Sequence, residues 1–325
     1  MIEVKDLKVY FDIHQGFLEG LLAKETPQVK AVDGISFDIG AGEILSLVGE
    51  SGSGKTTTGK ALLQLVDTTS GDIQFEGDRI RPKDKKWMRH FRQSAQMIYQ
   101  DPYQSINPKY LILDVVAEPL VVNGMVKSQG EKVERVIEAL EWAGLKPAAE
   151  FLYRYPHELS GGQRQRVAIA CALIMNPKFM VADEPVSMLD VSIRADILKL
   201  MSELREKRGI SYLFITHDLS LAWLISDRVA IMYLGKIVEI GSADIMSNGC
   251  LHPYSKALVS VMPVPRAIKD RKRMVLKGET PDPIRLPTGC RFHPRCPLAE
   301  DRCREVEPVL KEIHPGHLVA CHLVE

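Results

Sequence analysis

The sequence predicts an α/β fold in which helices cover a mostly parallel sheet. Beyond residue 178, short apolar runs typical of strands alternate with helical stretches such as 193–207. Nearer the N-terminus, the apolar run 44–48 ends at a glycine-rich turn, and residues 56–66 continue with helical periodicity. Parallel strands need crossover helices, so this alternation favours a parallel sheet over an antiparallel one.

The remaining elements follow in chain order. Residues 2–9 alternate imperfectly and 32–39 has apolar residues at period two, so both are expected to be strands, and 16–27 interrupts the pattern as a long loop. Helical periodicity without strand signals then predicts a helical subdomain over about 101–178. Strand-like runs return afterwards, at 179–182, 212–215, 229–233 and, after a turn at Leu234-Gly235, 236–240.

The composition changes past about residue 250, where prolines crowd together with four of the six cysteines. We therefore expect one large domain over 1–250 and an irregular C-terminal extension over 251–325. The extension has few contiguous apolar runs, so we expect something other than a large core to fix it.

Charge and hydropathy exclude several classes of protein. The 42 Lys and Arg residues balance 42 Asp and Glu residues, which gives no electrostatic reason to expect nucleic acid as a partner. The N-terminus lacks a basic start and an apolar segment, and no apolar run approaches the roughly 20 residues that cross a bilayer. We expect a cytosolic chain that reaches a membrane only through another protein.

A phosphate-binding loop (P-loop) follows the strand at 44–48, with the sequence Gly49-Glu50-Ser51-Gly52-Ser53-Gly54-Lys55-Thr56. Gly52 and Gly54 let successive backbone N–H groups converge on phosphate oxygens, and the following helix adds its positive end. Lys55 is expected to reach the β- and γ-phosphates of ATP, and the Thr56 hydroxyl to bind Mg²⁺.

Two further motifs carry chemistry. The apolar strand 179–182 ends at Asp183 and Glu184, which predicts an Mg²⁺-holding carboxylate followed by a carboxylate that polarises the attacking water. The segment Leu159-Ser160-Gly161-Gly162-Gln163 predicts a serine-capped helix whose N–H groups form an anion site.

With these motifs in this order, the chain resembles the ATP-binding-cassette (ABC) ATPases. The resemblance implies a P-loop NTPase cassette with a mostly parallel sheet core, an antiparallel β subdomain and a helical subdomain. It implies that Ser160 to Gln163 bind the partner subunit's ATP, so that hydrolysis needs a head-to-tail dimer. Ser187-Met188-Leu189-Asp190 is similar to the family's D-loop, whose usual second residue is Ala.

Further site residues come from the same resemblance. Gln100 resembles the glutamine that touches Mg²⁺ and water, and His217 the histidine that senses the γ-phosphate; a surface glutamine and a structural histidine are the alternatives. Phe11 would stack on adenine, with Tyr10 as the alternative. The nucleotide-binding set is Phe11, Gly49, Ser51, Gly52, Ser53, Gly54, Lys55, Thr56 and Thr57.

Four cysteines of the extension form a second constellation, spaced C-x5-C-x6-C-x17-C: Cys290, Cys296, Cys303 and Cys321. The residues alone leave three interpretations open: a zinc site, an iron–sulfur cluster and unligated structural thiols. Common zinc modules use more closely spaced cysteine pairs than these. His293 and His322 are possible substitute zinc ligands.

The whole chain resembles one ATPase subunit of a prokaryotic dipeptide/oligopeptide ABC importer. The most specific stretches are His252-Pro253-Tyr254-Ser255-Lys256-Ala257-Leu258 and Gly289-Cys290-Arg291-Phe292-His293-Pro294-Arg295-Cys296-Pro297. Two further stretches carry the resemblance: one runs from residues 100–103 through residues 107–108, and the other is 182–187. In the second, Val186-Ser187 favours the second of the two ATPase subunits that such importers pair. The resemblance implies a structural [4Fe–4S] cluster on the four cysteines, with zinc as the alternative.

The implied partners are a homologous ATPase subunit, or an identical one in isolation, two transmembrane permeases and, indirectly, an extracytoplasmic solute-binding protein. The protein would then lie on the cytoplasmic face of the membrane. Nickel or short sugars are alternative solutes. A soluble ABC protein acting on nucleic acid is the rival, but such proteins have two cassettes or a long coiled coil. The lowest-ranked alternative is that the extension is a redox or regulatory module and that the ATPase activity of the chain is secondary.

Overall fold

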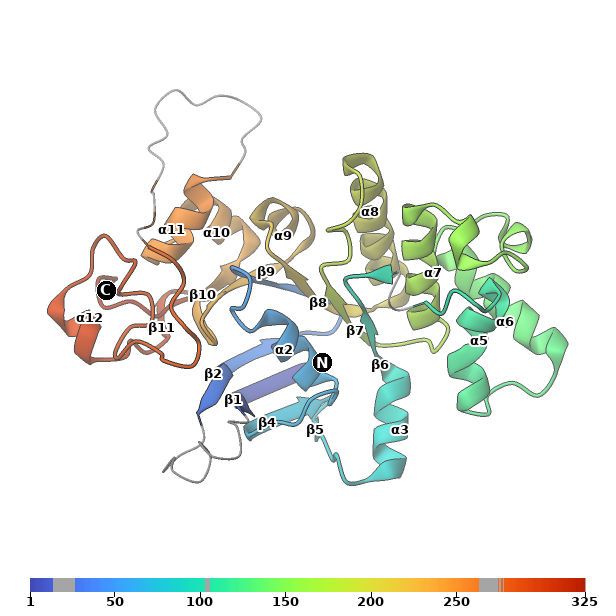
Figure 1. Ribbon diagram of the computed structural model, residues 1–325, viewed down its shortest axis with the longest axis horizontal. Helices are drawn as coiled ribbons and strands as arrows, with labels where there is room; N and C mark the ends of the chain where they lie inside the picture. Colours follow the sequence, from blue (N-terminus) through green and yellow to red (C-terminus); the bar gives the residue numbers. More distant parts are fainter. Residues whose placement is uncertain (14–26, 103–105, 263–273, 275, 277, 325) are drawn as a thin grey trace. The chain divides into compact units, whose positions relative to one another are not determined.

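The structure is a computed structural model that describes residues 1–13, 27–102, 106–262, 274, 276 and 278–324 (Figure 1). The chain divides into two compact units, each built from separate stretches of the sequence. Unit 1 comprises Met1, Ile39–Glu43 and Arg81–Phe214; unit 2 comprises Ile2–Asp38, Ile44–Ile80 and Ile215–Glu325. Most of the loop expected at 16–27 lies outside the described residues, as does Tyr103 of the stretch 100–103.

Unit 2 contains an antiparallel β-sheet with the strand order β2-β1-β4-β5. Strand β1 pairs antiparallel with β4, and β4 with β5. The apolar side chains of β1 that alternate in sequence, Ile2 and Val4 and then Leu7 and Val9, are buried, with a register shift between the two pairs. The strands are β1 (Ile2–Asp12), β2 (Gln28–Ile39), β4 (Ser70–Phe75) and β5 (Asp78–Arg79).

A second group of strands in unit 2 contains the buried strand β3 (Ile44–Val48), which pairs in parallel with β9 (Arg228–Tyr233). Strand β9 forms an antiparallel pair with β10 (Lys236–Ser242). The C-terminal extension adds β12 (His317–Val319) to β10 and β11 (Lys311–His314) to β12. The helices of this unit are α2 (Lys55–Leu62), α9 (Leu219–Ile225), α10 (Ala243–Gly249), α11 (Pro253–Ser260) and α12 (Asp301–Glu305).

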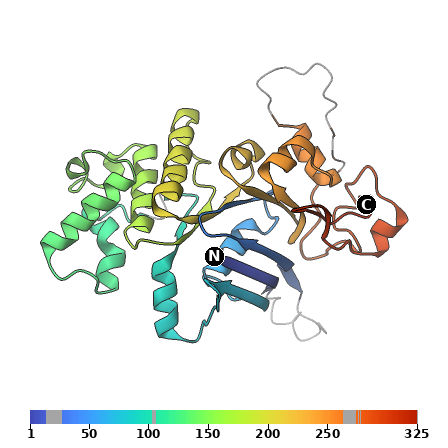
Figure 2. The same cartoon turned by 180° about the vertical axis from the view of Figure 1, so that it is seen from behind.

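Unit 1 combines a parallel strand pair with a group of packed helices. Strands β6 (Ala95–Ile98) and β7 (Phe179–Asp183) are parallel. Helices α5, α6 and α7 pack against one another, and Figure 2 shows these green helices from behind. The helices are α3 (Lys85–Ser94), α5 (Ile112–Val122), α6 (Gln129–Trp142), α7 (Gly161–Leu173) and α8 (Val191–Arg208). Strand β8 (Ser211–Thr216) crosses the boundary between the units.

The predicted α/β cassette fold is confirmed, and the differences in detail have physical reasons. Helix α3 falls in a stretch rich in Lys and Arg, but its apolar residues Trp87, Met88 and Phe91 have helical spacing. Asp84 starts it by accepting bonds from the N–H groups of Lys86 and Trp87, and Met88 and Phe91 are buried. Strands β11 and β12 are too short to leave a period-two pattern.

The extension packs into a buried core that it shares with β9 and β10 of unit 2. The Phe292 ring is 1% exposed and lies 5.3 Å from the ring centroids of both Tyr233 and Tyr254. Glu239 of β10 is fully buried and accepts bonds from His317 at 2.8 Å and from the N–H group of His252 at 3.0 Å. Aromatic packing and this buried network therefore fix the extension to β9 and β10.

Acid should destabilise the protein through His252, which starts α11 and whose Nδ1 accepts a bond from the Tyr254 N–H group at 3.1 Å. Burial, together with nearby Lys256, lowers the pKa of His252 to about 3. Because the unfolded chain binds a proton near pH 6.5 and the folded chain does not, stability falls as the pH drops from about 6.5 toward 3.

Denaturant unfolding at pH 7 and pH 5 measures this effect. His252→Asn keeps a capping acceptor and removes the titration, so it should lose about 2 kcal/mol less than the wild type on acidification. The exposed His90→Asn serves as the control and should follow the wild type. Identical pH dependence of His252→Asn and wild type would contradict the assignment.

Candidate functional site

The P-loop joins β3 to α2 in unit 2. All five residues of β3 are buried, and α2 begins at Lys55 after Gly54, which has the left-handed φ of 104° and no capping side chain. The first turn of α2 contains Thr56 and Thr57. A helix start without a side-chain cap presents N–H groups and a positive dipole end to an anion. The loop therefore has the local geometry of a phosphate site.

Glycine is required where the loop backbone meets neighbouring strands. A Cβ atom on Gly49 would lie 2.2 Å from the carbonyl oxygen of Met232 in β9. A Cβ atom on Gly54 would lie 2.1 Å from the carbonyl oxygen of Ala31 in β2. Gly52 has a φ of 77° but nothing within 4 Å of the Cβ position, so only its backbone conformation needs glycine.

The Lys55 side chain folds back over the loop. Its Nζ donates to the carbonyl oxygens of Gly49 at 2.8 Å and Glu50 at 2.9 Å, and only 6% of the residue is exposed. The carbonyl oxygen of Ser53 accepts a bond from the N–H group of Gly235 at 2.9 Å. The ammonium group is thus held over the centre of the loop, where bound phosphates would lie.

The two aromatic candidates for adenine differ in their surroundings. The Tyr10 hydroxyl donates to the Asp33 carboxylate, and the ammonium of Lys30 lies 5.5 Å from its ring centroid. Phe11, the next residue of β1, is 42% exposed. Phe11 therefore offers an open ring face for stacking, whereas the hydroxyl of Tyr10 is already bound within the protein.

His217 of unit 2 lies between β8 and α9 and is exposed. The next residue, Asp218, starts α9 by accepting a bond from the Ser220 N–H group at 2.8 Å, and its own N–H group donates to Thr216 Oγ1 at 3.0 Å. These two bonds fix the backbone on the C-terminal side of His217.

Unit 1 brings Gln100 and Glu184 together. Strands β6 and β7 pair in parallel, with Ile98 opposite Ala182. Gln100 and Glu184 each lie two positions further along the chain, so they meet at the same edge of the strand pair. Gln100 Nε2 donates to Glu184 Oε2 at 3.0 Å. Asp183, the last residue of β7, is 4% exposed. The predicted water-polarising carboxylate and the predicted glutamine thus share one hydrogen bond.

The backbone around Glu184 is tightly constrained. Glu184 has a positive φ of 45°, which is uncommon for a residue with a side chain. Its carbonyl oxygen accepts bonds from the N–H group and the hydroxyl of Ser187, at 3.2 and 3.0 Å. Arg194 of α8 donates to the carbonyl oxygen of Leu189 at 2.6 Å, next to the exposed Asp190 that starts α8. These bonds fix the backbone at Glu184 and the course of the D-loop-like segment.

The segment Ser160 to Gln163 begins helix α7 as predicted. Ser160 Oγ accepts a bond from the Gln163 N–H group at 3.3 Å, and Gln163 Oε1 accepts one from the Ser160 N–H group at 3.0 Å. A Cβ atom on Gly162 would lie 2.7 Å from Ile193 Cγ2 of α8, so a larger residue would displace α7 or α8. This helix start, next to Gly161, keeps the anion-binding character of an N-terminus.

In the described part of the extension, Tyr254, Thr280 and Arg295 contact the P-loop, and these contacts were not predicted. The Tyr254 hydroxyl accepts a bond from the Glu50 N–H group at 3.0 Å. Arg295 Nη1 and Thr280 Oγ1 both donate to Glu50 Oε2 at 2.7 Å. No local pattern signals contacts between residues more than 200 positions apart. Tyr254 and Arg295 do lie in the two stretches, 252–258 and 289–297, that carry the resemblance to peptide importers.

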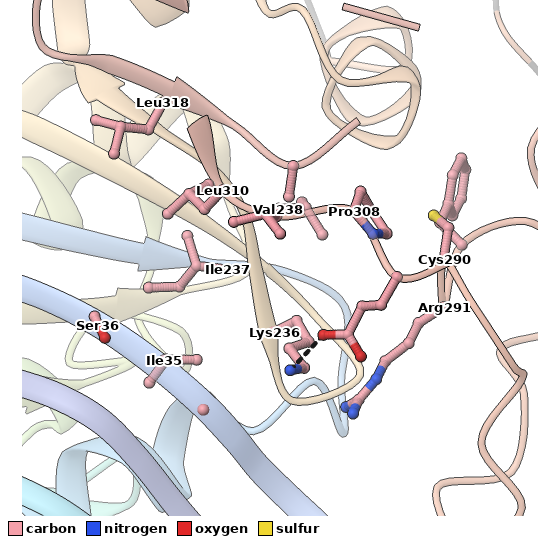
Figure 3. Close-up of a pocket in the computed structure, with 15 residues that line it drawn as sticks. Ile35, Ser36, Lys236, Ile237, Val238, Cys290, Arg291, Pro308, Leu310 and Leu318 are labelled. Carbon is pink, nitrogen blue, oxygen red and sulfur yellow. Dashed lines mark ion pairs between the residues drawn. The ribbon is translucent and has the colours of Figure 1, made fainter. Parts of the chain in front are cut away.

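A separate cavity of about 560 Å³ lies in unit 2 and is drawn in Figure 3. Its walls are mainly apolar, with Ile35, Val238 and Leu310 among the lining residues, and the dashed line in Figure 3 marks the 2.6 Å ion pair between Lys236 and Glu307. Among the described residues that line this cavity, none is predicted to bind nucleotide.

The prediction of a [4Fe–4S] cluster is wrong, and so is its zinc alternative. Across residues 1–13, 27–102, 106–262 and the described part of the extension, no group of three or more His, Cys, Asp or Glu residues could hold a metal ion. Burial raises the pKa of Cys290 to about 11 and also raises the pKa of Cys296 and Cys321. These three cysteines and the buried Cys303 form no disulfide.

Comparison with known proteins decides the family. Residues 32–187 match the family described as ABC transporter, and residues 238–303 match the C-terminal region of oligopeptide/dipeptide transporters. The oligopeptide transport ATP-binding protein AppF of Bacillus subtilis is 46% identical, over 99% of this chain and 97% of its own. This chain belongs to the ATP-binding subunits of oligopeptide ABC transporters. YkfD of the same organism, named a putative oligopeptide transport ATP-binding protein, is 44% identical over 99% of this chain and 95% of its own.

A solved structure agrees with the cassette fold. The ATP-binding cassette MJ0796, described as a dimer in a post-hydrolysis state with ADP and Pi, matches with a TM-score of 0.64 and 26% identity. The match covers 75% of this chain and 99% of that one. The predicted family and the predicted ATPase activity are thereby confirmed. No helix in the described residues is both long and apolar enough to span a membrane.

Alanine substitution in the P-loop separates close packing from backbone conformation. Gly54→Ala introduces both the unfavourable positive φ and the overlap with Ala31, whereas Gly52→Ala introduces only the positive φ. Gly52→Ala should cost about 1–2 kcal/mol of unfolding free energy. Gly54→Ala should cost clearly more and abolish ATP binding. Denaturant unfolding and nucleotide titration measure both, and equal stability of the two variants would contradict the packing argument.

Proposed function

We propose that this protein hydrolyses ATP to power the import of di- and oligopeptides through an ABC transporter. The supporting observation is the presence of two matched segments in one chain, the cassette at 32–187 and the oligopeptide/dipeptide transporter region at 238–303. The first supplies the ATPase. The second separates this chain from cassettes in general and favours peptides over nickel or short sugars as the solute.

We assign the phosphates of ATP to the P-loop and adenine to Phe11. Backbone N–H groups of the loop and Lys55 neutralise the phosphates, and the exposed Phe11 ring stacks on the base. Mg²⁺ is assigned to Thr56, Gln100 and Asp183. Hydroxyl, amide and carboxylate oxygens are the donors that this cation prefers, and the buried end of β7 holds Asp183 in one place.

Glu184 is assigned as the general base for the attacking water. Gln100 orients its carboxylate through the 3.0 Å bond, and the bonds from Ser187 to its carbonyl oxygen fix the backbone. His217 is assigned to the γ-phosphate. General base catalysis needs a carboxylate fixed in one direction, which these contacts favour.

Two subunits are needed for hydrolysis in this proposal. Ser160, Gly161, Gly162, Gln163 and Asp190 serve the ATP of the partner subunit, with the positive start of α7 facing its γ-phosphate. The dimeric state described for the MJ0796 cassette supports this arrangement. We propose a heterodimer with a homologous ATPase subunit, and a homodimer when this chain is isolated.

The remaining partners follow from transport. The ATPase dimer would bind two transmembrane permeases on the cytoplasmic face of the membrane, and an extracytoplasmic solute-binding protein would deliver the peptide. The two named relatives, AppF and YkfD, support the peptide as solute.

Replacing the proposed base tests the catalytic assignment. Glu184→Gln keeps an oxygen that accepts from Gln100 but removes the basic carboxylate, so hydrolysis should fall by about 100-fold or more while ATP affinity is unchanged. Exposed Glu206→Gln on α8 is a matched control and should hydrolyse ATP like the wild type. Steady-state turnover of Glu184→Gln within tenfold of the wild type would remove Glu184 from this role.

Co-purification tests the partners. Affinity-tagged protein extracted from native membranes in mild detergent should recover two permeases and a second ATPase subunit in stoichiometric amounts, identified by mass spectrometry. Recovery with nucleic-acid-bound proteins, or with permeases of a nickel or sugar importer, would contradict the peptide assignment.

A further inference from the structure

The C-terminal extension contacts the nucleotide-binding end of unit 2 through two arginines. Arg291 and Arg295 are four residues apart in the chain, and both are largely buried, with side chains 8% and 10% exposed. Each forms an ion pair with a carboxylate from the first 50 residues, Arg291 with Asp33 and Arg295 with Glu50. Buried arginines with specific carboxylate partners fix geometry more strongly than exposed pairs do.

Arg295 holds the P-loop at Glu50. Its Nη1 lies 2.7 Å from Glu50 Oε2, and its guanidinium lies 5.9 Å from the ring centroid of Tyr233. The backbone of Glu50 is held as well, because its N–H group donates to Tyr254 and its carbonyl oxygen accepts from Lys55 at 2.9 Å. Side chain and backbone of this one P-loop residue are therefore both fixed, largely by the extension.

The charge of Glu50 explains why this contact matters for ATP. A carboxylate within a phosphate-binding loop repels the anionic phosphates, and the repulsion is strong where solvent is partly excluded. Arg295 is the ion-pair partner of this carboxylate. Without Arg295, the negative charge of Glu50 would act on the bound nucleotide, and ATP affinity would fall.

Arg291 holds a second support of the loop. Its guanidinium donates to the carbonyl oxygen of Leu234 and to the Asp33 carboxylate. The N–H group of Gly235 donates to Ser53 of the P-loop, and its carbonyl oxygen accepts from the Asp33 N–H group, both at 2.9 Å. Burial opposes ionisation of Asp33, but bonds from Tyr10 and Arg291 outweigh it and lower its pKa.

We propose that Arg295 is a positioning residue for ATP, because Arg295 neutralises Glu50 and fixes the P-loop. Arg291 supports the same loop through the Leu234–Gly235 turn. The C-terminal extension thereby sets the affinity of this subunit for ATP. The inference rests on the proposed assignment of the P-loop to ATP.

Nucleotide titration of the full-length chain tests it. Arg295→Ala should raise the Kd for ATP by about tenfold, the effect expected for losing one charge-assisted bond. The KM for ATP should rise in parallel while kcat changes by less than about threefold, because Gln100 and Glu184 are untouched. Arg295→Lys keeps the charge and should fall between Arg295→Ala and the wild type.

A second substitution separates repulsion from unfolding. Adding Glu50→Gln to Arg295→Ala removes the unpaired charge and should return the Kd to within about threefold of the wild type. Arg304→Ala in α12, whose side chain is 62% exposed and 4.0 Å from Asp301, is the matched control and should leave the Kd unchanged.

Two results would overturn the inference. One is an unchanged Kd and KM in Arg295→Ala. The other is a loss of affinity that Glu50→Gln fails to recover, since that result would mean general destabilisation rather than charge repulsion. Failure of the wild type itself to bind ATP would reject the proposed function instead, so the two failures are distinguishable.

Discussion

Close backbone packing of the P-loop is the constraint on which the nucleotide end of this protein depends. At Gly49 and Gly54 the loop lies against carbonyl oxygens of β9 and β2, with no room for a Cβ atom. This packing fixes where α2 begins and where Lys55 folds back over the loop. Phosphate recognition by backbone groups requires such rigidity, since N–H groups that move cannot converge on an anion.

The extension is a structural part of the ATPase in unit 2 rather than an appendage held by a metal. Its cysteines are clustered in sequence, and that clustering suggested a ligand set. The structure instead fixes the segment with a buried Phe292 ring, the His317–Glu239 contact and strand β12. The proline-rich composition predicts little buried surface, but a few large aromatic side chains supply the packing.

Local features of this fold were predictable from the sequence, and long-range contacts were not. The P-loop, the end of β7 and the serine-capped start of α7 each depend on adjacent residues whose spacing is visible in the chain. The bond between Gln100 and Glu184 depends on strand register, and the pair of Arg295 and Glu50 on the folding of unit 2. Neither depends on a local period, so only the structure reveals them.

The central claim is that ATP hydrolysis by this subunit drives peptide import, and uptake of a labelled oligopeptide into proteoliposomes tests it most directly. The vesicles would contain the two permeases and both ATPase subunits, with ATP inside and the solute-binding protein outside. Peptide should accumulate with wild-type protein and ATP, and fail to accumulate when Glu184→Gln replaces the wild type or when ATP is omitted. Equal accumulation with and without ATP, or none for any peptide alongside rapid uptake of a metal ion or sugar, would contradict the account.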